Sequence, residues 1–392
     1  FIFGSISANA TEYHVSSAFT CVSDGTAKRP FRQLSNAAMI MKPGDTCIVH
    51  KGVYRESVGI KSAGEKDKPI AFIAARGERV VVSGTDLLQA DWKKHEGNIF
   101  EARVPGSVRQ LFVEGDMMIE ARWPNMSLDD LWNRNRWAKA GKGSRYGKMV
   151  DPGLAETGID WTGAIATLNV AHQFYTWTRT VTDHEPSSNT FHYAANLQTI
   201  TNYADKERPW EDDRYCLTGK LEALDTEGEW FHDEETGTLY LWAPGGVDPG
   251  SLRIETKARD FAFSGAETSY LRLAGFEFFA CTFELNNADG SVIEDCHVRY
   301  PNWARRLYDD PEAVDSDQAA TRLSGNNITM RDCSFAWGPT KGLQVVGRRN
   351  VVEDGLFHDF CWNGSLRDPV VSIHSQGKEP AEDRCIVRHC TL

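Results

Sequence analysis

The chain has 392 residues, of which 41% are hydrophobic and 25% are charged, the proportions of an ordinary globular protein with one large or two smaller domains. Its formal net charge of −12 argues against nucleic acid or an anionic membrane as the main partner. No apolar run reaches the roughly 18 residues that would predict a membrane-spanning helix, so membrane insertion is not expected.

The first ten residues, FIFGSISANA, join an apolar stretch to small residues. This pattern is similar to the end of a secretory signal peptide, although an ordinary buried strand is the alternative. The signal-peptide interpretation predicts a mature chain that starts near Thr11 and is secreted or periplasmic. Export permits disulfides, but nine cysteines are an odd number, and only Cys21 and Cys47 suggest a pair near the N-terminus.

Residues 11–86 are expected to form an N-terminal cap and the first strands of the main domain. The run FRQLSNAAMIM places Phe31, Leu34, Ala38 and Met41 on one face of a helix. Strand-like segments punctuated by Gly and Pro follow it. An amphipathic helix in this place would close the open end of a stack of strands.

Residues 87–250 are expected to form a separate β-rich, sandwich-like insertion. They hold nine of the twelve tryptophans, and alternating segments such as LNVAHQFYTWTRTV favour antiparallel strands. Within them, residues 131–150 carry six Lys or Arg and no acidic residue. This basic segment could bind an anionic polysaccharide or could simply be a solvated loop.

One phrase recurs in residues 251–392. It reads VIEDCHV (292–298), TMRDCSF (329–335), VVEDGLFH (351–358) and IVRHCTL (386–392). The base period is about 21–23 residues, enlarged in places by a longer loop, and it predicts a stacked repeat architecture. Helical periodicity is absent, so we predict an all-β fold, a right-handed parallel β-helix.

In such a β-helix, Cys296, Cys333 and Cys390 would form an interior column, with Gly355 in the equivalent place. These cysteines are therefore predicted to be structural rather than catalytic. The chain stops within a coil, and uncapped edges invite pairing with other chains. We therefore expect a truncated C-terminus, with further coils in a longer protein.

Three segments resemble relatives of glycoside hydrolase family one hundred and forty-one, secreted bacterial β-helix proteins with fucosidase and xylanase activities. These segments are DGTAKRPFRQLSNAAMIMKPGDTCIVHKGVYRE (24–56), RQLFVEGDMMIEARWPN (109–125) and GEWFHDEETGTLYLWAPGG (228–246). The resemblance implies a monomer that acts on a polysaccharide or oligosaccharide and requires no cofactor. The Glu-x-Ile-Ser-x-Lys-Ser type of motif found in some polysaccharide lyases is absent from the sequence.

The first long loop of the repeat region, residues 299–325, is a candidate site. Asp309 and Asp310 are candidate catalytic residues, because glycoside hydrolysis uses one carboxyl group as acid and a second as base or nucleophile. The loop also supplies aromatic rings and guanidinium groups for sugar binding; the candidates are Trp303, Arg305, Arg306 and Tyr308. A solvated acidic loop that holds Ca²⁺ is the alternative.

The second long loop, residues 357–383, offers another set. The candidate catalytic residues there are His358, Asp359, Asp368 and His374, and the candidate substrate-binding residues are Trp362 and Arg367. Alternatively, His358 and Asp359 form a capped turn, and His374 is a structural residue in a strand.

Three functions fit these patterns. The first is a secreted glycoside hydrolase that acts on a plant or algal polysaccharide through paired Asp or Glu residues, without a metal. The second is a lyase or epimerase on a uronic-acid polymer, which needs an Arg, Tyr or His base and often Ca²⁺. The third is a non-catalytic glycan-binding protein.

Overall fold

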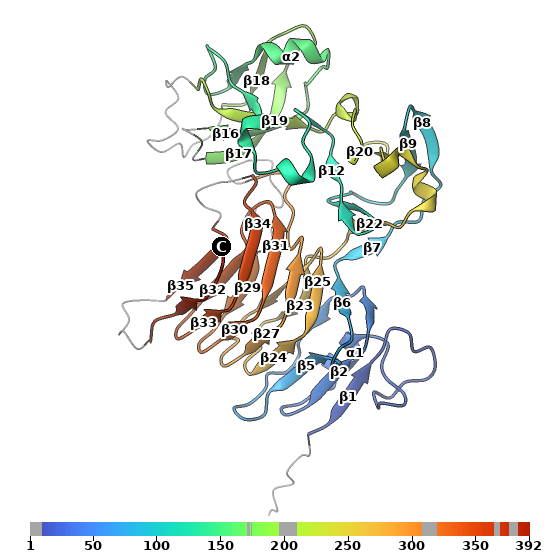
Figure 1. Cartoon of the computed structure of the whole chain (residues 1–392), viewed down its shortest axis with the longest axis vertical. Coiled ribbons are helices and arrows are strands. Elements are labelled where there is room, and N and C mark those ends of the chain that lie inside the picture. Colours follow the sequence, from blue (N-terminus) through green and yellow to red (C-terminus); the bar gives the residue numbers. More distant parts are fainter. Residues whose placement is uncertain are drawn as a thin grey trace, which may run out of the picture.

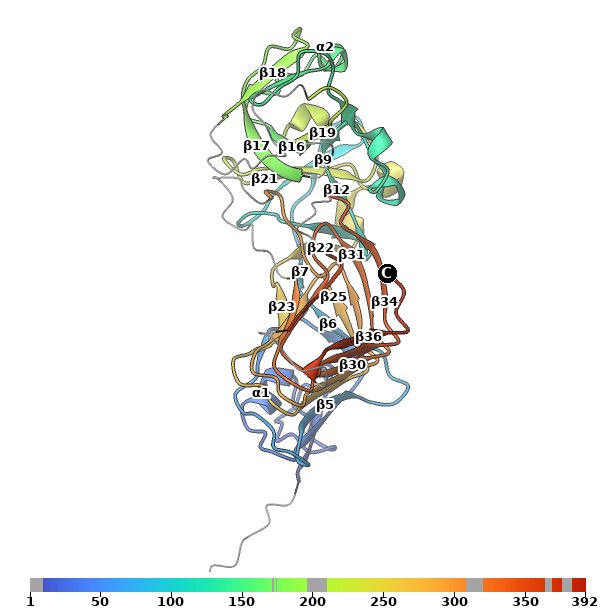
Figure 2. The same ribbon diagram turned by 90° about the vertical axis from the view of Figure 1, so that its left-hand side faces the viewer.

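The structure is a computed structural model that describes residues 10–170, 173, 175–195, 210–307, 320–363, 369–375 and 383–392. Within these ranges the chain is nearly all β, with strands in six sheets and two short α-helices. Three parallel sheets form one end of the molecule and antiparallel sheets form the other (Figure 1; Figure 2). None of the helices in these ranges is long and apolar enough to cross a membrane.

The three parallel sheets share one path of the chain. The first sheet contains β1 (Glu12–Val15), β2 (Thr46–Val49), β5 (Ile70–Ala74), β24 (Leu271–Ala274), β27 (Val292–Glu294), β30 (Thr329–Arg331), β33 (Val351–Glu353) and β36 (Ile386–Arg388). The second contains β3 (Gly52–Tyr54), β6 (Val80–Ser83), β25 (Phe276–Phe279), β28 (His297–Arg299), β31 (Ser334–Gly338) and β34 (Leu356–Phe360). The third contains β4 (Val58–Gly59), β23 (Phe261–Gly265), β26 (Thr282–Leu285), β29 (Thr321–Ser324), β32 (Leu343–Val346) and β35 (Val371–His374). The chain visits the sheets in turn, as from β24 to β25 to β26, and then returns to the first sheet at β27.

Three antiparallel or mixed sheets hold all the described strands between β6 and β23. The four-stranded sheet contains β7 (Thr85–Leu87), β10 (Leu111–Val113), β11 (Asp116–Met117) and β22 (Ile254–Lys257). The five-stranded sheet contains β8 (Lys93–Glu96), β9 (Ile99–Arg103), β12 (Ile119–Glu120), β20 (Glu229–Asp233) and β21 (Thr238–Leu241). The seven-stranded sheet contains β13 (Arg122–Trp123), β14 (Ala138–Lys139), β15 (Lys148–Val150), β16 (Ile165–Val170), β17 (Tyr175–Asp183), β18 (Thr190–Tyr193) and β19 (Arg214–Thr218).

The recurring sequence phrase corresponds to the step from the first to the second parallel sheet. Each copy contains a strand of the first sheet, a turn residue, and a strand or bridge that continues toward the second sheet. The turn residues have left-handed backbone conformations, with φ of 50° at Asp295, 53° at Asp332, 52° at Asp354 and 55° at His389. Because Asp and His tolerate this region better than β-branched residues do, the turn explains the polar residue before each Cys or Gly.

The cysteines of the repeat face the core. Cys296 and Cys333 are buried, and the partly buried Cys390 packs against the same cluster of apolar side chains. This agrees with the predicted structural role. The suggested Cys21–Cys47 pair is wrong, because Cys47 is buried in β2 while Cys21 lies exposed on the surface, and both are free thiols.

Helix α1 (Leu34–Ala38) packs Leu34, Ala37 and Ala38 against the core of the parallel sheets. Its first N–H groups have a distant partner, because the Glu56 carboxylate accepts hydrogen bonds from the backbone N–H of Leu34 (2.8 Å) and Ser35 (3.0 Å). The helix is only five residues long, shorter than the amphipathic segment suggested. The second helix, α2 (Pro152–Thr157), begins after Asp151, whose side chain accepts a hydrogen bond from Gly153 N–H.

Candidate functional site

A small cavity of about 50 Å³ lies between the antiparallel sheets and the loops of the parallel sheets. Strands β12, β13, β16 and β19 form one side of it, and segments 303–305 and 362–363 form the other. Its lining residues are Met117, Ile119, Glu120, Arg122, Leu131, Thr167, Cys216, Thr218, Trp303, Ala304, Arg305, Trp362 and Asn363. We call it the junction cavity.

Three of the predicted substrate-binding residues meet there, since Trp303, Arg305 and Trp362 all line the junction cavity. The two tryptophans belong to an aromatic cluster that also contains Tyr300 and Trp132. Arg306 lies next to Arg305 but points to the antiparallel sheets, where its guanidinium donates a hydrogen bond to Thr180 Oγ1 (3.0 Å) on β17.

The histidine candidates lie on two different sheets. His358 is exposed near the end of β34, and its Nδ1 is 2.7 Å from a carboxylate oxygen of Asp359, which has a left-handed φ of 60°. His374 is exposed at the end of β35, and its Nε2 is 2.6 Å from Ser372 Oγ. The remaining predicted site residues lie outside the described ranges; they are Tyr308, Asp309, Asp310, Arg367 and Asp368.

The acidic loop suggested for Ca²⁺ also lies largely outside the described ranges. Within those ranges, no three His, Cys, Asp or Glu side chains are grouped so as to hold a metal ion.

Sequence reasoning missed Glu120, the central acid of the junction cavity. It lies on β12, which pairs in parallel with β20, and only 5% of its surface is exposed. Its carboxylate forms an ion pair with Arg305, with 3.0 Å between Oε1 and Nε. The same guanidinium reaches Glu234, with 3.1 Å between Nη1 and Oε1.

Burial raises the pKa of Glu120 above its usual value, although the positive charge of Arg305 opposes this effect. The negative charge of Glu234 raises the pKa further, while Arg122 lowers it. A carboxyl group in this setting holds its proton to a higher pH than an exposed glutamate does.

Arg122 lines the same cavity from β13 and is almost entirely buried. Its Nε donates a hydrogen bond to the Pro124 carbonyl oxygen (3.1 Å), and its guanidinium lies 5.5 Å from the ring centre of Trp137. Among the residues that the structure describes, its buried Nη2 has no hydrogen-bond partner. The cavity therefore offers one buried carboxyl group and a guanidinium with an unused donor.

The sequence contains one signal that could have indicated Glu120. In MMIEARW (117–123), a Glu and an Arg stand two residues apart within an otherwise apolar run. Buried Glu and Arg side chains are uncommon unless they are paired or functional.

The basic segment 131–150 uses several of its charges within the chain. Arg136 forms an ion pair with Asp130, and Lys139 forms one with Asp212 (2.7 Å). Arg134 stacks over the buried Trp137 ring, 5.3 Å from its centre.

The chain was compared with known proteins at the levels of family, sequence and fold. No protein-family model matches it. The uncharacterized protein YwoF of Bacillus subtilis (strain 168) is 34% identical over 70 residues, which are 18% of this chain and 15% of YwoF. This stretch covers far less than two thirds of either protein.

The fold resembles that of a solved protein described as a glycoside hydrolase, with a TM-score of 0.61 and 15% identity. That alignment covers 97% of this chain and 88% of the other protein. A complex of XylC with xylose aligns over 97% of this chain and 58% of XylC, with 17% identity and a TM-score of 0.49. At these identities the likeness extends to the fold alone.

Proposed function

We propose that this protein is a secreted or periplasmic carbohydrate-active enzyme, a glycoside hydrolase with Glu120 as its proton donor. The observation that carries the proposal is a buried carboxyl group of raised pKa in a cavity bordered by tryptophans and arginines. The fold likeness to a protein described as a glycoside hydrolase supports it.

The chemistry begins with a sugar ring held against the partly exposed ring of Trp303, since aromatic faces suit the apolar faces of sugars. Glu120 donates its proton to the oxygen of the leaving group as the bond to the anomeric carbon breaks. Arg305 binds Glu120 and Glu234 together, and Glu234, with a side chain 57% exposed, provides a second carboxylate. This second group can activate water or attack the anomeric carbon.

We further propose that the three parallel sheets are the coils of a right-handed parallel β-helix, with 11–86 as the cap and first coils. Residues 87–250 would be its sandwich-like insertion and residues 251–392 its later coils. Each turn of the chain adds one strand to each of the three sheets, next to the strand of the previous turn, and this pairing supports the architecture.

The test is Glu120→Gln, assayed on a panel of neutral, uronic and sulfated polysaccharides and on aryl glycosides. We expect kcat on natural linkages to fall by roughly 10²–10⁴, the usual contribution of a general acid. Aryl glycosides with acidic leaving groups should lose much less, because they need no proton. Wild-type activity should fall as pH rises through the raised pKa of Glu120.

Glu156→Gln is the matched control, because Glu156 is exposed on α2, away from the cavity residues. Equal losses on both kinds of leaving group would indicate a structural role for Glu120. A wild-type protein that binds a glycan but releases no product would replace the enzyme proposal with the glycan-binding one.

The second candidate function is a polysaccharide lyase. It is favoured by Arg299 and His358, which share an outward-facing row of the second parallel sheet with Ala336 between them. Elimination from a uronate needs a cation beside the carboxylate and a base. New reducing ends accompanied by the ultraviolet absorbance of an unsaturated sugar would identify this chemistry, and reducing ends alone would identify hydrolysis.

A further inference from the structure

The outer face of the second parallel sheet carries a groove that the junction cavity does not include. Two hollows, with volumes of about 110 and 450 Å³, share Val53 and Arg55 as lining residues. The smaller one extends over β3, β6, β25 and β28, and the larger one continues to the segment before α1. We call these two neighbouring hollows together the arginine groove.

Strand register determines which side chains face this groove. Val53, Val81 and Glu277 form one row on adjacent strands, and Ser83, Phe279 and Arg299 form the next. The residues between these rows face the core, because side chains alternate along a strand. Three strand spacings separate β3 from β28, about 14 Å, which is the length of a short oligosaccharide.

Five arginines line the groove and are the reason for its name. They are Arg32, Arg55, Arg79, Arg253 and Arg299. Such a concentration is unexpected in a chain of net charge −12. Guanidinium groups bind carboxylate and sulfate groups through paired hydrogen bonds.

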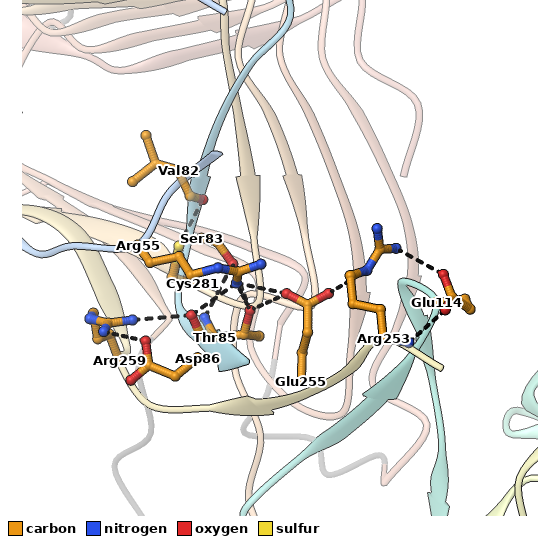
Figure 3. Close-up of polar contacts among 10 residues, drawn as sticks. All are labelled: Arg55, Val82, Ser83, Thr85, Asp86, Glu114, Arg253, Glu255, Arg259 and Cys281. Carbon is orange, nitrogen blue, oxygen red and sulfur yellow. Dashed lines mark hydrogen bonds and ion pairs between the residues drawn. The ribbon is translucent and has the colours of Figure 1, made fainter. Parts of the chain in front are cut away.

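A buried carboxylate holds two of these arginines in place (Figure 3). Glu255 forms ion pairs with Arg55 (2.7 Å) and with Arg253 (3.3 Å). Arg55 also donates a hydrogen bond to Thr85 Oγ1 (2.6 Å), which itself donates to Glu255 (2.8 Å). Glu114 reaches Arg253 from the other side, at 3.7 Å. Fixed guanidinium groups lose little conformational freedom when a ligand binds.

The other arginines differ in their pairing. Arg79 forms an ion pair with Glu277 (2.6 Å). Arg299 lies over the Phe279 ring, 5.5 Å from its centre, and neither it nor Arg32 has an ion pair with any residue in the described ranges. The side chains of these two arginines can therefore take an external anion without breaking an internal pair.

We propose that the arginine groove binds a glycan segment that carries carboxylate or sulfate groups. Val53, which is 48% exposed, provides apolar surface for a sugar face, and the arginines bind the anionic groups beside it. The inference rests on the proposed function, because it names the class of glycan that Glu120 would cleave. The arginine groove and the junction cavity both border the β10–β11 region, the groove at Gly115 and the cavity at Met117.

The test is calorimetric binding of the full chain to four probes: an oligogalacturonide, a sulfated galactan oligosaccharide, a neutral galactan oligosaccharide and a single-stranded oligonucleotide. Arg299→Gln and Arg32→Gln are the variants. Arg145→Gln is the matched control, since Arg145 is an exposed arginine of the basic segment 131–150. Circular dichroism of each variant checks that the fold is kept.

We expect an anionic oligosaccharide to bind at least about tenfold more tightly than the neutral one, and less tightly as salt rises. Arg299→Gln should weaken this binding by about tenfold, as expected for a lost charge-assisted hydrogen bond. Arg145→Gln should change it by less than about twofold. Preference for the carboxylated or the sulfated probe identifies the anionic group.

Equal binding of neutral and anionic oligosaccharides would overturn the proposal. A loss of affinity in Arg145→Gln alone would also overturn it, because the binding site would then lie in the basic segment 131–150. Binding of the oligonucleotide as tight as that of the anionic oligosaccharide would overturn it as well. Product release is measured separately. Binding that depends on Arg299 but is not followed by turnover would support the arginine groove and refute the enzyme proposal. Turnover that does not depend on Arg299 would support the enzyme proposal and refute the groove as its binding site.

Discussion

Two buried glutamates on neighbouring strands have raised pKa values for the same main reason. Glu120 lies on β12 and Glu229 on the paired strand β20, and burial disfavours the ionised form of each. Arg122 lowers both pKa values, but it does not cancel the effect of burial. The two glutamates differ in whether a ligand can reach them, because Glu120 lines the junction cavity and Glu229 does not.

Glu229 gives a prediction for stability against pH. Burial, and next the negative charge of Asp225, raise the pKa of Glu229 from 4.5 to about 9, against the opposing effect of Arg122. Because the folded pKa lies above the unfolded one, its contribution to stability is full below about pH 4.5 and is lost as pH rises through about 9. Glu229→Gln should therefore gain stability relative to wild type as pH rises across this window.

Chemical denaturation at a series of pH values measures this difference. The gain should be smallest near pH 5 and should level off above about pH 9. Glu156→Gln, on the exposed surface of α2, is the control variant. A flat curve for Glu229→Gln would show that Glu229 ionises normally in the folded protein.

At the scale of elements, the turn from the first to the second parallel sheet recurs with a left-handed residue. Asp332 provides it between β30 and β31, with φ of 53° and an exposed side chain. A β-branched residue is strongly disfavoured there, whereas Gly adopts the region freely. Asp332→Val should therefore lower the free energy of unfolding by about 1–2 kcal/mol, and Asp332→Gly should change it little.

Urea denaturation of the two variants checks this turn prediction. Thr329→Val is a suitable control, because Thr329 is a strand residue of β30 where a β-branched side chain is favourable. Equal destabilisation by Val and Gly at position 332 would mean that the Asp side chain, rather than its backbone conformation, stabilises the turn.

The same repeat explains how much of the fold could be predicted from the sequence. Each copy of the phrase around Cys296 and Cys333 contains a strand, a turn residue and a second strand. Because equal units that repeat along the chain stack side by side, the period alone predicts parallel strand pairing. The suggested disulfide between Cys21 and Cys47 was wrong, because spacing in the sequence does not reveal that the Cys47 side chain faces the core. Short strands such as β12, only two residues long, have no periodic signal to detect.

At the scale of the whole molecule, the candidate site depends on contacts between distant segments. Loop 301–307 reaches the antiparallel sheets through Arg305, whose partners Glu120 and Glu234 lie on or beside the five-stranded sheet. Trp132, in the basic segment, donates a hydrogen bond to the Phe360 carbonyl oxygen (3.2 Å) on β34. The sequence suggested Trp303, Arg305 and Trp362 by their chemistry, but only the folded chain brings them to Glu120.

The ion pair between Glu120 and Arg305 therefore joins the two parts of the molecule. Its acid is buried, while the Arg305 side chain is 32% exposed, so the guanidinium is partly solvated. Arg305→Met would leave Glu120 buried without its main cation and raise its pKa further. We expect a cost of about 2 kcal/mol in the free energy of unfolding, less than for a fully buried pair because of that exposure.

A double-mutant cycle measures the coupling between these side chains. Glu120→Gln removes the carboxyl group that Arg305 contacts, so the double variant with Arg305→Met should lose less stability than the two single losses added together. The pair Lys139 and Asp212, both exposed on the antiparallel part, provides a control cycle in which we expect a coupling below about 1 kcal/mol. Additive losses at Glu120 and Arg305 would show that their contact contributes nothing to the junction, and that the aromatic cluster around Trp303 and Trp362 holds the two parts together by packing alone.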